Sequence, residues 1–321
     1  MTENTCYKNW GTIPMMLIAI VLFCTQSCKS DKKQNNEAAV AAVPENVIKI
    51  VTETMEFQMP DTITSGWNTW RYNNKSTQTH FILIDKYPDG ITLDSIKQKV
   101  LPVFGDGMTL INEGKTEEGF AEFGKFPQWF SKVEWPGGVG FISPGQTAET
   151  TLKLDPGHYF VECYVKMNTG MFHTNMGMIK ELVVVAEKST LKEPQADVAI
   201  NISSEEGIVF APPVKAGRHT FSVNYLDQAT YDHFLGHDVN LVKIEDDADE
   251  KVLEAWMDWR DPKGLLEPAP EGFIFLGGVN DMPKGGKGYF TANLEKGKYA
   301  LISEVPNASE KNLLKTFVIV E

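Results

Sequence analysis

Residues 157–165 of the chain read GHYFVECYV, and residues 297–305 read GKYALISEV, so one short segment occurs twice without a gap. Each copy starts at a Gly and is rich in aromatic and β-branched residues, which is typical of a β-strand that begins at a turn. In the first copy Tyr159, Cys163 and Val165 would share one face, because the side chains of a strand alternate. A repeated strand predicts a repeated structural unit.

The sequence upstream of this strand repeats in the same way. A Gly-Gly pair and then a second strand precede the segment in both copies, and an apolar strand followed by a helical stretch lies further upstream. The second strands are 148–154 and 288–294, the apolar strands 80–84 and 237–241, and the helical stretches about 93–103 and 246–259. Many short strands between Gly and Pro turns favour a sandwich over a parallel sheet. We therefore predict an all-β protein of two tandem Greek-key β-sandwiches, each with one inserted helix.

The domain organisation follows from these repeats. The chain has 321 residues, which is enough for two domains. We place the first sandwich at 46–187, a polar and Pro-containing linker at 188–197, and the second sandwich at 198–321. Residues 28–45 are polar and lack periodicity, so we interpret them as a flexible tether.

The first 27 residues have the layout of a secretory signal peptide. Lys8 gives a modestly positive start, and an apolar run over 13–23 follows, too short to span a bilayer comfortably. Ser27 and Cys28 resemble the end of a bacterial lipobox, in which a small residue precedes the lipidated Cys. The resemblance implies a protein held at the bacterial cell envelope by a lipid on Cys28, facing the periplasm or on the outer membrane. An uncleaved amino-terminal anchor is the alternative.

Charge and motifs exclude several classes of function. The net charge is −13, which argues against nucleic acid as a partner. A phosphate-binding loop, a His-Glu-x-x-His motif and a Gly-x-Ser-x-Gly elbow are all absent from the sequence. An enzyme is therefore the least favoured class.

Cysteine usage draws attention to one residue. The chain has four Cys, of which Cys6 and Cys24 leave with the signal peptide and Cys28 receives the lipid. Cys163 then has no intramolecular disulfide partner. A single thiol in an oxidising compartment is either buried and inert or bound to something.

The first repeat resembles the cupredoxins, the plastocyanin and azurin family of small copper sandwiches, over about residues 46–187. Thr79-His80-Phe81 looks like the family strand that carries its first His ligand. Cys163, then His173, then Met176-Gly177-Met178 follow near the end of the repeat in the family's order. The separation between Cys163 and His173 is longer than is usual in the family, so the intervening loop would have to bulge outward.

The resemblance implies one mononuclear copper ion. Its ligands would be His80, Cys163 and His173, with Met178 or Met176 as the axial sulfur. A thiolate and two imidazoles with a weak thioether suit both copper oxidation states. In the second repeat Ser303 stands in the place of Cys163, which implies a degenerate domain without the metal.

The sequence allows three interpretations of the site. The first is electron transfer by a copper protein with a redox partner. The second is copper handling with a copper-donor protein, because the Met-rich stretch 167–178 would favour Cu(I). The third is a metal-free double β-sandwich that acts as a binding or structural lipoprotein, with Cys163 as a buried apolar residue.

The lipid anchor can be tested by Cys28→Ala. We expect this change to stall processing of the signal peptide or to release the protein from the membrane fraction, because the acceptor of the lipid is lost. Fractionation and immunoblotting measure both effects. Unchanged processing and membrane retention would contradict lipidation and leave export possible.

Overall fold

Strands are the main regular element of the computed structural model, which describes residues 46–211, 213–231 and 234–320. The all-β class is confirmed. The predicted signal peptide, the tether and Cys28 lie outside the described residues. In the described part of the chain, no helix is both long and apolar enough to cross a membrane.

The strands of the first half follow the expected order. They are β1 (Val47–Thr52), β2 (Thr62–Asn74), β3 (His80–Asp85), β4 (Gly138–Ile142), β5 (Thr147–Leu154), β6 (Gly157–Glu162) and β7 (Ile179–Lys188). The second half has β8 (Val198–Ser203), β9 (Gly207–Phe210), β10 (Gly217–Tyr225), β11 (Val239–Ile244), β12 (Phe273–Val279), β13 (Lys287–Leu294), β14 (Gly297–Ile302) and β15 (Leu314–Ile319). Apart from β9, every strand of one half has a counterpart in the other.

The pairing pattern repeats with the strands. β1 pairs in parallel with β2, as β8 does with β10, and the β2–β5 pair matches the β10–β13 pair. The β3–β4, β3–β6 and β6–β7 pairs match β11–β12, β11–β14 and β14–β15. Pairing of strands that are not neighbours in the sequence is typical of a Greek key. The boundaries at 187 and 198 stay a prediction, because the described residues form one compact unit.

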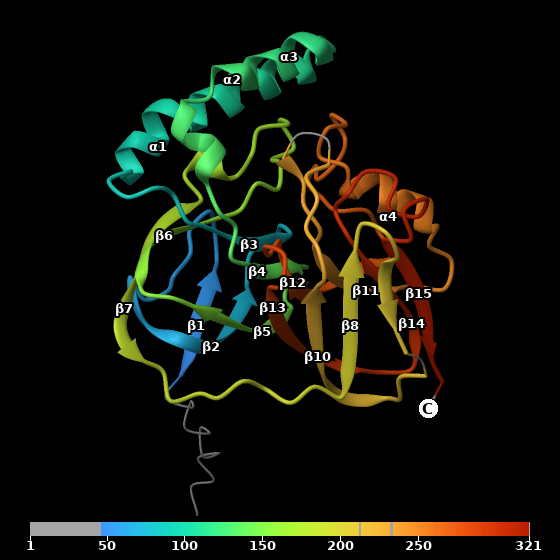
Figure 1. Ribbon diagram of the computed structural model, residues 1–321. Coiled ribbons are helices and arrows are strands. Elements are labelled where there is room, and N and C mark those ends of the chain that lie inside the picture. Colours follow the sequence, from blue (N-terminus) through green and yellow to red (C-terminus); the bar gives the residue numbers. More distant parts are fainter. Residues whose placement is uncertain (1–45, 212, 232–233, 321) are drawn as a thin grey trace, which may run out of the picture. The chain divides into compact units, whose positions relative to one another are not determined.

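Both sheets run from one repeat into the other (Figure 1). β4 pairs antiparallel with β12 in one sheet, and β5 pairs antiparallel with β13 in the other. The repeated Gly-Gly pair lies at this junction. A side chain on Gly140 of β4 would come within 2.8 Å of the Gly278 backbone nitrogen of β12, and one on Gly277 of β12 within 2.5 Å of the Ala148 side chain of β5. Glycine is therefore required for the close approach of these strands.

The number of helices in the first half differs from the expected one. The first half carries three α-helices between β3 and β4, where we expected one over about 93–103: α1 (Leu93–Lys99), α2 (Leu101–Asn112) and α3 (Thr116–Glu122). Short 3₁₀ helices η1 (Phe123–Lys125) and η2 (Gln128–Lys132) follow them. Pro102 in the first turn of α2 separates it from α1, since proline removes a backbone donor. The second half has α4 (Glu250–Met257), shorter than expected and capped by the Asp249 side chain.

These helices give the first half a second apolar layer. α1, α2 and α3 lie at one end of its strands (Figure 1). Beneath them a small cluster separate from the main core contains Tyr87, Ile96, Val100 and Phe160. The outer face of β6 is therefore covered by protein, whereas one face of an antiparallel sheet commonly meets water.

Asn240 links the two repeats at the strand junction. Its side-chain oxygen accepts a hydrogen bond from the Phe141 backbone N–H at 2.9 Å, and its amide donates to Asp238. Asn240 is fully buried. We expect Asn240→Ala to lower the free energy of unfolding by about 1–3 kcal/mol, because it leaves a buried N–H without a partner. Urea denaturation measures the change, and the exposed Asn293→Ala should cost less than about 0.5 kcal/mol. Equal effects of the two changes would contradict this role.

Candidate metal centre

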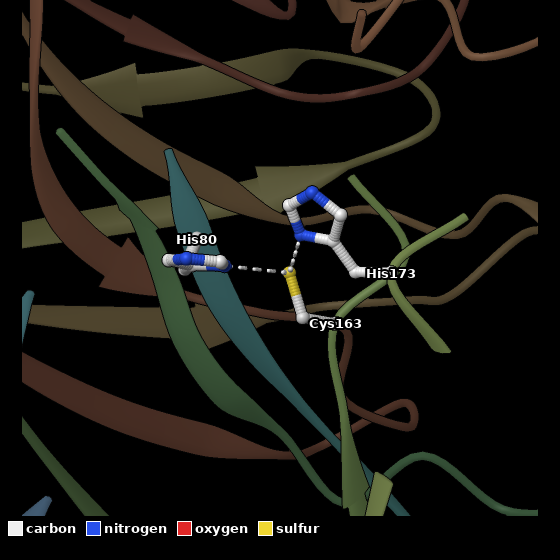
Figure 2. A group of neighbouring side chains, drawn as sticks. All are labelled: His80, Cys163 and His173. Carbon is white, nitrogen blue, oxygen red and sulfur yellow. Dashed lines mark hydrogen bonds between the residues drawn. The ribbon is translucent and has the colours of Figure 1, made fainter. Parts of the chain in front are cut away.

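Three of the predicted ligands meet in the interior of the first repeat. His80 Nδ1 lies 3.7 Å from Cys163 Sγ, and His173 Nδ1 lies 3.6 Å from the same sulfur. Figure 2 shows both rings turned toward the sulfur. All three side chains are 0% exposed, and their donor atoms lie within 4.8 Å of one another. Among the described residues no other group of three His, Cys, Asp or Glu side chains is as close.

His80 is placed by the loop that leads into β3. Asn74, at the end of β2, donates its amide hydrogens to the carbonyl oxygens of Gln78 at 2.7 Å and Ile142 at 2.9 Å. The Thr79 N–H donates to the Glu267 carboxylate at 2.8 Å. His80 is therefore fixed on both sides, by its own repeat and by a side chain of the second.

A hairpin explains how His173 returns to Cys163 across nine intervening residues, 164–172. The His173 N–H donates to the Val165 carbonyl at 2.8 Å, and Lys166 forms a bridge with Phe172. The turn is closed by the bond from the Gly170 N–H to the Met167 carbonyl. The residues that were expected to bulge outward thus form an ordered hairpin. The hairpin accommodates the extra residues and keeps Cys163 and His173 close together.

The second repeat holds this hairpin through a buried lysine. Lys166 is 0% exposed, and its Nζ donates to the backbone carbonyls of Trp259 at 2.6 Å and Asp261 at 2.7 Å. Its backbone also bonds to Leu265 and Glu267. A buried ammonium group is stable only when its hydrogen bonds are satisfied. The ligand loop is therefore attached to the segment that follows α4.

Burial sets the protonation of the three side chains. Burial lowers the pKa of His80 to about 3, with a smaller contribution from His173, and it lowers the pKa of His173 to about 4. Burial raises the pKa of the Cys163 thiol far above its ordinary value. At neutral pH both rings are therefore neutral, which is the form of imidazole that binds a metal.

The spacing fits a single soft metal ion. Imidazole nitrogen and thiolate sulfur lie about 2.0 and 2.3 Å from a metal such as zinc. At angles of 110–120°, two such ligands are about 3.5–3.7 Å apart, which agrees with both sulfur–nitrogen distances. The Nε2 atoms of both rings are buried and find no hydrogen-bond partner among the described residues. Two imidazoles and one thiolate are the ligand set of copper electron-transfer sites, and the donor set supports copper.

The methionines of the loop differ in their surroundings. Met178 is fully buried, and its carbonyl oxygen accepts the Cys163 N–H at 3.3 Å. Met176 is 56% exposed. The Met167 sulfur lies 3.8 Å from the Gln78 amide, and the Met171 sulfur 4.0 Å from the Thr109 hydroxyl. The burial of Met178 makes it a better axial candidate than Met176.

The second repeat shows the same positions engaged by protein. Strand registers align His80 with His237 and Cys163 with Ser303. His237 Nε2 lies 2.7 Å from the Tyr231 hydroxyl, and its Nδ1 lies 3.6 Å from Asp227. The Ser303 hydroxyl donates to Asp238 at 2.7 Å. In the second repeat, His237 Nε2 and the Ser303 hydroxyl thus bond to other side chains, whereas in the first the two histidines converge on Cys163.

Comparisons with known proteins do not assign the chain to a family. Neither a protein-family model nor a curated protein matches the chain. A reduced auracyanin from Roseiflexus castenholzii is similar over 44% of this chain and 97% of its own, with 20% identity and a TM-score of 0.27. Auracyanin A, a blue copper protein from Chloroflexus aurantiacus, is similar over 43% and 98%, with 18% identity and a TM-score of 0.27. A multicopper oxidase is similar over 85% and 87%, with 12% identity and a TM-score of 0.21. Likenesses at such scores say nothing about the site, which rests on its own geometry.

Several residues around the centre were not predicted from the sequence. Glu267 binds the His80 segment from across the repeat junction, and Lys166 of the ligand hairpin binds carbonyls on the far side of it; only the tertiary structure brings these groups together. Asp85 and Glu162 are acidic residues on the outer faces of β3 and β6. The repeat itself held a signal for Glu162, because Ile302 stands in its place.

The lowered pKa of His173 predicts acid sensitivity of the metal-free protein. Below pH 6.5 the unfolded chain takes up a proton on His173 that the folded protein binds only near pH 4, so stability falls as the pH drops through this window. This group costs about 2 kcal/mol at pH 5. We expect His173→Gln to reduce the loss of stability between pH 7 and pH 5 by that amount, as measured by urea denaturation. The surface variant His158→Gln should behave as wild type, and parallel pH profiles for all three proteins would contradict the assignment.

Proposed function

We propose that the protein is a cupredoxin-like electron carrier with one copper ion bound by His80, Cys163, His173 and Met178. The convergence of two neutral imidazoles on one buried thiol is the observation that supports it. A thiolate and two imidazoles accommodate both Cu(I) and Cu(II) with little change in geometry. When bound, copper would supply a one-electron redox couple, and the residues of the chain would fix its ligands and exclude water.

Burial and the scattered methionines favour electron transfer over copper handling. A carrier that exchanges its ion needs ligands within reach of a donor protein, whereas the three donors here are fully buried. The sulfurs of Met167 and Met171 contact other side chains, and Met176 points to the surface, so they do not extend the site. Hydrogen bonds to both repeats also hold the segments that carry the buried ligands, which favours an ion that stays bound.

The cellular setting belongs to the same proposal. A lipid on Cys28 would hold the protein at the bacterial cell envelope, facing the periplasm or on the outer membrane. The partner of an anchored electron carrier would be another redox protein, and the net charge of −13 favours one with a basic docking surface. We propose no catalytic activity for the protein itself.

The visible spectrum of the full chain with Cu(II) tests the proposal. A thiolate bound to Cu(II) gives an intense charge-transfer band, which imidazole or carboxylate sites do not. We expect the band in wild type, its loss in Cys163→Ser, and its loss or marked shift in His173→Gln. His158→Gln is the matched control, because this exposed histidine lies away from the centre and should leave the band unchanged.

Other outcomes separate the alternatives. Tight retention of Cu(I) without the band in the Cu(II) protein, lost in Met176→Leu and Met178→Leu, would replace electron transfer by copper handling. If neither copper state raises the melting temperature, the metal-free double sandwich is correct. A bound ion at a hundredfold its dissociation constant should add about 2.7 kcal/mol, which such a measurement detects.

A further inference from the structure

A cavity of about 80 Å³ lies directly behind the metal ligands. Glu162 and Tyr164, which flank Cys163, line it, and so do Phe172 and Thr174, which flank His173. Neighbours in an extended chain point to opposite faces, so Cys163 faces the core while Glu162 and Tyr164 face the cavity. About 10–15 Å³ of such volume holds one water molecule. The cavity therefore has room for several waters or a molecule of a few heavy atoms.

One of the residues that line this cavity is a buried acid with a carboxyl oxygen that lacks a hydrogen-bond partner. Asp85, the last residue of β3, is 1% exposed. Its Oδ2 atom has no hydrogen-bond partner in the described part of the chain. Glu162 and Asp281 line the same cavity. Burial raises the pKa of Asp85 well above its ordinary value, with a further contribution from the nearby Glu162. A buried carboxylate of this kind is costly unless a positive charge offsets it.

The second repeat shows that the fold itself does not require these acids. Asp85 pairs with Phe160 as Val242 pairs with Ala300, so Val242 stands in the place of Asp85. By the same registers Ile302 stands in the place of Glu162. Both aliphatic residues are fully buried and belong to the core. Acidic side chains at positions that the same strands otherwise fill with Val and Ile indicate a purpose other than folding.

The remaining walls of the cavity are mostly aromatic. They include Tyr87, Phe104, Phe130, Trp135, Tyr164 and Trp259. Aromatic faces attract cations, and the attraction grows when the cation is desolvated. A divalent metal ion fits poorly, because among the described residues no group of three acidic side chains is close enough to hold one. An organic cation needs only one or two carboxylates and apolar walls for its substituents.

We propose that this cavity binds a small organic ammonium ion, about the size of methylammonium or ethylammonium, with Asp85 as its counter-charge. The ammonium group would donate hydrogen bonds to the free Oδ2 atom of Asp85, and its alkyl group would pack against the aromatic rings. Glu162 and Tyr164 would then lie between this ligand and Cys163. The inference does not depend on copper, because it uses the opposite face of β6.

Thermal unfolding of the full chain in the presence of methylammonium chloride tests the proposal. We expect a saturable rise in the melting temperature, with sodium chloride at equal ionic strength and ethanol as the neutral analogue giving none. Asp85→Val places the residue of the second repeat in the first, and Asp85→Asn keeps the shape without the charge. Both should abolish the rise, while the exposed Asp89→Asn should retain it.

Each other result overturns the inference. A rise that persists in Asp85→Asn, an equal rise with ethanol, or no saturable rise at all would exclude an ammonium site. A rise produced by magnesium chloride and lost in Asp85→Asn would replace it with a metal site. If Asp85→Val does not fold, Asp85→Asn alone decides. The visible copper band should be unchanged in the Asp85 variants, so failure here is distinct from failure of the copper centre.

Discussion

Backbone pairing of β4 with β12 and of β5 with β13 is the constraint on which the rest of the described structure depends. It merges the sheets of the two repeats edge to edge, and it requires the glycines at the junction for their close approach. The joining of the sheets also affects the metal centre. It brings Glu267 against the loop that carries His80, and it brings the carbonyls after α4 against Lys166 in the ligand hairpin. The geometry of the ligands is therefore a property of both repeats.

Much of the fold could be predicted from the sequence because strands and turns are local. The repeat around Cys163, the alternation of its apolar residues and the Gly-Gly pairs all correspond to observed strands and their junction. The helices were harder to predict, because Pro102 divides a stretch whose sequence predicts a single helix. His80, Cys163 and His173 were recognisable by their order, and the structure brings them together. The contribution of Lys166 could not be foreseen, because its partners lie more than ninety residues away and depend on how the sheets join.

The two repeats use the same positions in opposite ways. In the first, the Nδ1 atoms of His80 and His173 both face the Cys163 sulfur, so three donor atoms converge on one point. In the second, His237 and Ser303 are bonded to Tyr231 and Asp238, and the outer strand positions are aliphatic. Polar groups at equivalent points of one fold thus differ in whether they converge on one another or bond to other side chains. That difference separates a place prepared for a ligand from a place that only supports the fold.

The attachment of Lys166 has a consequence for how this chain can change over generations. A duplicated domain that has lost its metal ligands is usually free to drift or to be deleted. Here the carbonyls of Trp259 and Asp261 bind Lys166 of the ligand hairpin, so deletion of the second repeat would remove contacts that hold this hairpin in place. Lys166 bonds to backbone carbonyls, so the side chains of the segment that carries Trp259 and Asp261 can vary. The backbone path of that segment cannot. Selection on the ligand hairpin of the first repeat would therefore also preserve the backbone path of the second repeat.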